Sequence, residues 1–92
     1  MRGPADGTGR PLGDEELAAI EARCRAATPG PWRSFIEGRD HTSGDSFIQT
    51  AGEDIYLTGA TAADQDFIAN ARQDIMRLVD EIRRLRAAKA AQ

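Results

Sequence analysis

Residues 61–88 read TAADQDFIANARQDIMRLVDEIRRLRAA, and this stretch decides the fold expected for the chain. Its apolar residues step alternately by three and four positions, which is the period of a helix with one apolar side. We name these residues the apolar seam: Ile68, Ala71, Ile75, Leu78, Ile82 and Leu85. Thr61 and Asp64 fit a capping box at the start of the helix. The pattern predicts one nearly unbroken helix whose seam suits either a core or a partner helix.

A tail and a shorter helix precede this region. Residues 1–13 contain four Gly and two Pro and almost nothing apolar, so they predict a flexible N-terminal tail. Asp14 is the expected N-cap of a first helix. This helix should end near Ala27, because Pro29 disfavours helical geometry at Thr28.

Three short segments between the helices carry β-branched or aromatic residues and are bounded by polar turns. They are residues 32–37, 46–50 and 54–58. Such segments predict a three-stranded antiparallel β-meander. A long amphipathic helix packed on a small sheet buries the apolar side of both. We therefore expect an α+β fold, with residues 14–92 forming a single domain.

Composition limits the classes of protein that the chain can belong to. It has 92 residues, a formal net charge of −3 and one cysteine, Cys24. A single cysteine excludes an internal disulfide and a multi-cysteine zinc site. We see no signal peptide and no run of the ~20 apolar residues that a membrane span needs, so a cytoplasmic location without membrane contact is expected. The few large apolar residues predict a thin core, which favours a homodimer.

Charge is distributed unevenly along the chain. Residues 37–66 hold seven acidic residues and one arginine, whereas residues 72–92 hold six basic and three acidic residues. The sequence therefore predicts an acidic middle and a basic helix end. Direct binding of nucleic acid by the helix end is not expected, because Asp80 and Glu81 can pair with arginines one turn away. The acidic middle could instead imitate nucleic-acid phosphates if its carboxylates share one face.

Two places in the sequence could contact a ligand or partner through the loops. The corner formed by residues 28–32 fixes Trp32, which either fills the core or offers its ring to a base or a partner pocket. The polar loop around Asp40, His41 and Asp45 could hold a metal or support acid–base chemistry. A solvated loop is the favoured interpretation, and we assign no catalytic residue, metal or cofactor.

Asn70 and Arg72 lie in the middle of the long helix and are further candidates. Arg72 is either a structural residue that pairs with Asp74 or an acid of the sheet, or an anion ligand that points into a cleft. The structural interpretation is favoured. In the second interpretation Asn70, Arg72 and Trp32 would contact a nucleotide.

Two segments resemble a group of small phage and prophage accessory proteins. Residues 26–32 read AATPGPW, and residues 64–86 resemble the ending D-A-x-F-I-A-x-A-R-x-D-I-P…E-x-x-R-L-R of that group. Together they cover 30 of the 92 residues. Met76 stands where the pattern has a proline, which would start a second helix. The resemblance implies a bacterial cell during phage infection or lysogeny as the setting, and it implies no enzyme activity.

Three functions are consistent with these features. The first is a non-enzymatic phage-type protein that binds and inhibits a host protein, such as a component of a defence system. The second is a sponge that sequesters a nucleotide second messenger. The third is an immunity protein or antitoxin that covers a toxin site with its acidic face. An enzyme that uses His41 is the least favoured interpretation.

Overall fold

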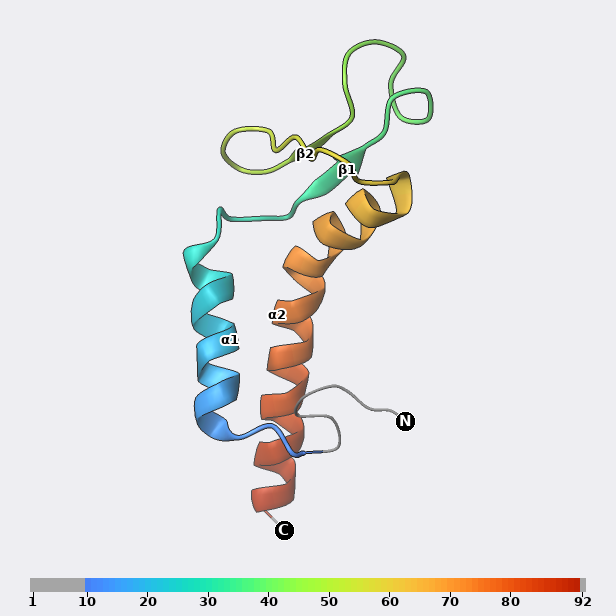
Figure 1. Cartoon of the computed structure of the whole chain (residues 1–92). Helices are drawn as coiled ribbons and strands as arrows, with labels where there is room; N and C mark the ends of the chain where they lie inside the picture. Colours follow the sequence, from blue (N-terminus) through green and yellow to red (C-terminus); the bar gives the residue numbers. More distant parts are fainter. Residues whose placement is uncertain (1–9, 92) are drawn as a thin grey trace.

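The computed structural model describes residues 10–91 and shows an elongated α+β arrangement. Its elements in chain order are helix α1 (Asp14–Ala26), strand β1 (Arg33–Phe35), strand β2 (Phe47–Gln49) and helix α2 (Ala62–Ala90). The β-hairpin packs on the first turns of α2, and α1 lies beside the rest of it (Figure 1). The principal extents are 55 × 33 × 20 Å. α2 therefore organises the molecule, because both other parts pack on it.

The long helix forms as the sequence predicts. The Thr61 side chain accepts a hydrogen bond from the Asp64 amide at 3.0 Å, and Asp64 Oδ2 accepts one from the Thr61 amide at 3.0 Å. These two bonds satisfy free N–H groups of the first turn. α2 then continues without a break past Met76. The prediction of one unbroken helix is confirmed.

α1 begins one residue earlier than the cap prediction places it. Gly13 is the N-cap and Asp14 is the first helical residue. Glu16 accepts a hydrogen bond from the Gly13 amide at 2.8 Å, whereas no N-cap side chain accepts from the first-turn amides as Asp14 was expected to do. The helix ends at Ala26, close to the predicted end.

The sheet has two strands and not the predicted three. β1 and β2 pair antiparallel, with Ser34 opposite Ile48. The predicted third strand, residues 54–58, is reduced to one bridge in which Ile48 and Ile55 exchange hydrogen bonds of 2.8 and 2.9 Å. Strand pairing ends there because the chain on both sides of Ile55 turns away, into the turn at residues 51–53 and toward Gly59 (φ 82°).

The core is small and lies where α2 meets α1 and the hairpin. The apolar side chains that are almost fully buried are Leu17, Ile48, Ala69 and Val79. Two of them come from α2 and share a face with the buried Gln65. The Gln65 amide nitrogen donates to Ser34 Oγ at 3.0 Å and lies 3.2 and 3.0 Å from the carbonyl oxygens of Phe35 and Phe47. A polar side chain thus joins the helix to both strands.

The apolar seam does not contribute to this core, which corrects the core interpretation of those residues. Ile68 and Ile75 are 38% exposed, Leu85 is 52% exposed and Leu78 is 60% exposed. Ala71 and Ile82 are partly exposed. The packed face of α2 lies roughly 100° around the helix from the seam. The seam therefore remains open along the side of α2.

The predicted tail falls mostly on residues 1–9, which lie outside the described residues. Its last part is in contact with the helices: Arg10 pairs with Glu16 at 2.6 Å, and Arg86 donates to the carbonyl oxygen of Leu12. Within residues 10–91, neither helix has a stretch apolar enough to cross a lipid bilayer.

Candidate functional site

The corner at residues 28–32 is held against the middle of α2. The Trp32 amide donates to Gln73 Oε1 at 2.9 Å, and Gln73 Nε2 donates to the Trp32 carbonyl at 2.8 Å. The Trp32 indole donates to the carbonyl of Thr28 at 2.9 Å. The ring is half-buried, so Trp32 neither fills the core nor stands free, as the two interpretations required. Its position is fixed by hydrogen bonds to its own chain.

Arg72 also binds the corner at residues 28–32. Its Nε donates to the Thr28 carbonyl at 3.1 Å, and among the described residues it forms no ion pair with Asp74. The structural interpretation of Arg72 therefore fits the geometry better than the anion-binding one, although its partner is a carbonyl and not a carboxylate. Asn70 donates to the Asp66 carbonyl at 2.8 Å, which is a bond within the helix.

A polar groove of about 480 Å³ runs beside Trp32, and Asn70 lines it together with Arg39 and Asp66. The guanidinium of Arg39 binds both carboxylate oxygens of Asp66, at 2.9 and 3.0 Å, and also pairs with Asp40 at 2.8 Å. Arg39 thus ties the loop before β2 to the first turns of α2. The two carboxylates leave little of its charge for an external anion.

The same contacts change the proton affinity of these groups. Hydrogen bonds from Arg39, with a further one from Ser34, lower the pKa of Asp66 to about 2. Hydrogen bonds from Arg39 and from the Ile36 backbone lower the pKa of Asp40, and both acids raise the pKa of Arg39. All three groups are therefore charged near neutral pH, and the cluster has a net charge of −1.

The loop that holds Asp40, His41 and Asp45 is shaped by its own backbone contacts. Asp40 accepts from the Ile36 amide at 2.8 Å. His41 Nδ1 donates to the Ser43 carbonyl at 2.6 Å, and the ring lies 5.6 Å from that of Phe47. Among the described residues, His41 Nε2 has no partner, and no group of three or more His, Cys, Asp or Glu side chains is placed to hold a metal ion.

The acidic middle of the sequence lies at one end of the elongated molecule. The loops between β1 and β2 and between β2 and α2 form this end, and the C-terminus of α2 lies at the other (Figure 1). Six of its acidic side chains are exposed: Glu37, Asp40, Asp45, Glu53, Asp54 and Asp64. We name this part of the molecule the acidic end.

An exposed aromatic residue stands on the acidic end. Tyr56 is 61% exposed, and its ring lies 6.1 Å from Phe47. Phe47 in turn stacks on Phe35 at 5.1 Å. This ladder of rings, formed by Phe35, Phe47 and Tyr56, holds one side of the Tyr56 ring in place, and much of the residue remains exposed. Exposed aromatic residues of this kind often anchor protein–protein contacts.

The arginines at the other end of α2 mostly hold the two helices together. Arg83 pairs with Glu21 at 2.7 Å, and Arg86 pairs with Asp14 at 2.8 Å. Arg84 pairs within α2, with Glu81. The prediction that Asp80 and Glu81 pair with arginines one turn away therefore holds for Glu81 and Arg84, whereas Arg83 and Arg86 link α2 to α1.

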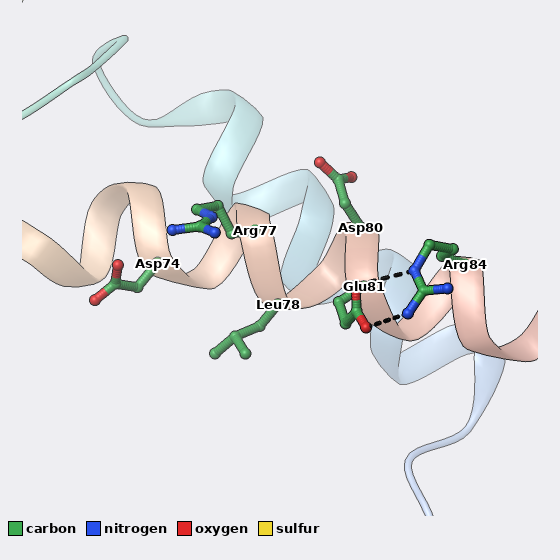
Figure 2. Close-up of a pocket in the computed structure, with 6 residues that line it drawn as sticks. All are labelled: Asp74, Arg77, Leu78, Asp80, Glu81 and Arg84. Carbon is green, nitrogen blue, oxygen red and sulfur yellow. Dashed lines mark hydrogen bonds and ion pairs between the residues drawn. The ribbon is translucent and has the colours of Figure 1, made fainter.

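The open side of α2 is the other distinctive surface. Leu78 extends from the helix between Asp74 and Glu81, and the charged side chains around it include the bonded pair of Glu81 and Arg84 (Figure 2). These residues line a shallow hollow of about 640 Å³. A second hollow of about 430 Å³ lies at the start of α2, where Leu57 and Ile68 line it beside Phe67, which is 74% exposed.

Sequence reasoning missed the two glutamines that position these surfaces. Gln65 and Gln73 are polar, so a search for apolar periodicity leaves them out. Their spacing of eight residues places them near the same face of α2, and this spacing is the feature of the sequence that could have identified them as packing residues. Tyr56 was recognised only as part of a strand.

Comparison with protein-family models, with characterised proteins and with solved structures gives no match for this chain.

Proposed function

We propose that this chain is a non-enzymatic, phage-type accessory protein that binds and inhibits a host protein, and that its acidic end makes the contact. The observation that carries this proposal is the position of Tyr56, which is mounted on an aromatic ladder at the end of the molecule where six exposed acidic residues lie. An aromatic anchor with a charged rim is the common arrangement of a protein-binding surface.

The charge of this end favours a basic partner. Arg39, the one arginine of residues 37–66, is already bound to Asp40 and Asp66. Exposed carboxylates such as Glu53 and Asp54 form no ion pair among the described residues. We therefore expect a host protein with a basic face, such as one that binds nucleic acid, and an association that weakens with salt.

The alternatives have less support. A nucleotide sponge needs Arg72 and Trp32 free for the ligand, whereas both are bonded to the Thr28 carbonyl. The acidic end would also repel a phosphate. An immunity protein or antitoxin would use the same acidic surface as a host inhibitor and differs in the identity of its partner.

The test is capture of a partner from bacterial lysate followed by reconstitution with the purified partner. The variant Tyr56→Ser and the double variant Glu53→Gln/Asp54→Asn should each weaken binding at least tenfold. The matched control Glu15→Gln/Asp80→Asn removes two exposed charges elsewhere and should bind normally. The variants that bind the partner more weakly must also inhibit the partner's activity less, and the control must inhibit it normally.

Three results would overturn the proposal. They are a partner encoded as a toxin beside this chain, a thermal shift with nucleotides but no protein partner, and binding that does not change in the Tyr56 and acidic-end variants. We also expect the chain to act as a homodimer, because large apolar side chains of the seam are exposed along α2. Contiguous exposed apolar surface of this kind often marks a protein–protein contact.

A further inference from the structure

We propose that the apolar seam of α2 binds the seam of a second copy of the chain in antiparallel orientation. The proposal builds on the homodimer expected above and specifies its surface and direction. The seam does not include Tyr56, Glu53 or Asp54, which the partner-binding test changes, so each proposal can fail without the other.

The first argument is that the seam matches itself when it is reversed. Turning one copy end over end pairs Ile68 with Leu85, Ala71 with Ile82, and Ile75 with Leu78 of the second copy. All six residues then have a partner, and the one small residue faces a large one. A parallel pair would instead place Ala71 against its own copy and leave a gap in the middle of the contact.

The second consideration is the order of charges beside the seam, which does not choose between the two directions. Asp74, Arg77, Glu81 and Arg84 alternate in sign along α2 and surround Leu78 (Figure 2). In the reversed pair, Asp74 of one copy lies level with Val79 of the other, two residues from Glu81 and five from Arg84, so the acids do not face the arginines directly. In a parallel pair these four side chains, which share one flank of the seam, face the other flank of the second copy and do not meet their own copies.

The third argument comes from the ends of the seam. Continuing the same register by one step brings Asp64 of one copy beside Lys89 of the second copy. Both residues are exposed. The acidic end of each copy then lies beside the basic end of the other. The hollow beside Phe67 lies where the last turns of the second copy would pass, which gives a reason for the exposure of that ring.

The size of the contact sets the expected affinity. The seam spans 18 residues, and its two ends are about 26 Å apart along the helix. Such a contact buries on the order of 600 Å² from each copy, somewhat less than the roughly 800 Å² per partner of a standard interface. We therefore expect a dimer that forms in the micromolar range and depends on concentration.

The first experiment measures assembly by sedimentation equilibrium between 5 and 500 µM. We expect the full chain to dimerise and Leu78→Lys to remain monomeric, because Leu78 lies next to the expected two-fold axis. The control Asp80→Asn, on the same helix but outside the seam, should dimerise normally. Circular dichroism should show unchanged helix content in both variants, since Leu78 is already 60% exposed in the single chain. A wild-type chain that stays monomeric at 500 µM overturns the proposal.

The second experiment determines the direction by disulfide formation in a Cys24→Ser background. Residues 68 and 85 are about 26 Å apart in one copy, too far for a bridge within the chain. In the antiparallel pair, the double variant Ile68→Cys/Leu85→Cys should form a cross-linked dimer on mild oxidation, and neither single variant should. Cross-linking of the Leu85→Cys single variant would show a parallel pair and overturn the proposed direction.

Discussion

The side-chain amide of Gln73 pairs with the backbone of Trp32 through two hydrogen bonds, one accepted from the amide at 2.9 Å and one donated to the carbonyl at 2.8 Å. A glutamine on a helix thus satisfies both polar backbone groups of a residue 41 positions away. Arg72 adds a bond to the Thr28 carbonyl four residues earlier. These contacts attach the link between α1 and β1 to the middle of α2. They therefore help to fix where α1 and the β-hairpin pack along α2.

We expect Gln73→Leu to lower the free energy of unfolding by about 1–3 kcal/mol, because the part-buried N–H and C=O of Trp32 lose their partners. Urea unfolding followed by tryptophan fluorescence would measure the loss. Gln73→Glu keeps the acceptor oxygen but places a carboxylate beside the Trp32 carbonyl, so it should also destabilise the fold. If both variants unfold within 0.5 kcal/mol of the wild type, the pairing does not hold the corner.

Gln65 makes the corresponding contact between α2 and the hairpin. It is 4% exposed, and its amide nitrogen lies within bonding distance of Ser34 Oγ and of the carbonyl oxygens of Phe35 and Phe47. Gln65→Leu should cost about 2–3 kcal/mol, because buried acceptors lose their donor. Thermal unfolding by circular dichroism measures this change. Gln49→Leu, a matched change on the exposed strand residue, should be close to neutral, and an equal effect of the two would contradict the assigned role.

These two glutamines also show why the sequence predicts α2 but not its packing. A helix and its cap depend on residues close together in the chain, such as Thr61 and Asp64, so their pattern is readable. The face that packs is chosen by contacts far apart in the sequence. Here that face carries Gln65 and Gln73, which an apolar pattern cannot single out, and the strongest apolar periodicity lies beside it.

The extent of the third strand and the roles of Trp32 and Arg72 could not be predicted from the sequence for a related reason. Whether residues 54–58 pair beyond Ile55 depends on where the turns on both sides direct the chain, and propensity does not contain that information. The polar character of Arg72 and Trp32 equally fits a ligand site or an internal bond. Only the position of the Thr28 carbonyl separates the two.

The contact between Arg39 and Asp66 predicts how stability changes with pH. The pKa of Asp66 is lowered from 3.8 to about 2 by hydrogen bonds from Arg39 and Ser34. A folded-state pKa below the unfolded one means that the stabilisation is complete above about pH 4–5 and is lost as the pH falls toward 2. Stability should therefore decrease over this window.

The variant Arg39→Gln tests this prediction. Without its main hydrogen-bond donor, the pKa of Asp66 should rise toward its ordinary value, so the loss of stability between pH 5 and pH 2 should become shallower. Urea midpoints measured across this range give the slope. Arg33→Gln is the control, because Arg33 lies over the Phe35 ring and forms no ion pair among the described residues. An unchanged slope in Arg39→Gln would contradict the assignment.

Met76 gives a test of the continuity of α2. It lies inside the helix, between the seam residues Ile75 and Leu78. Met76→Pro should remove a backbone hydrogen bond and clash with the preceding turn, which costs about 3 kcal/mol or more in a helix interior. Circular dichroism should show less helix and a lower unfolding midpoint, and the dimer should weaken, because the seam would no longer be continuous between Ala71 and Ile82. Met76→Leu keeps the apolar volume and should cost less than about 1.5 kcal/mol. If Met76→Pro keeps both full helix content and dimer affinity, the two halves of α2 act independently. The antiparallel pairing of the six seam residues is then not what holds two copies together.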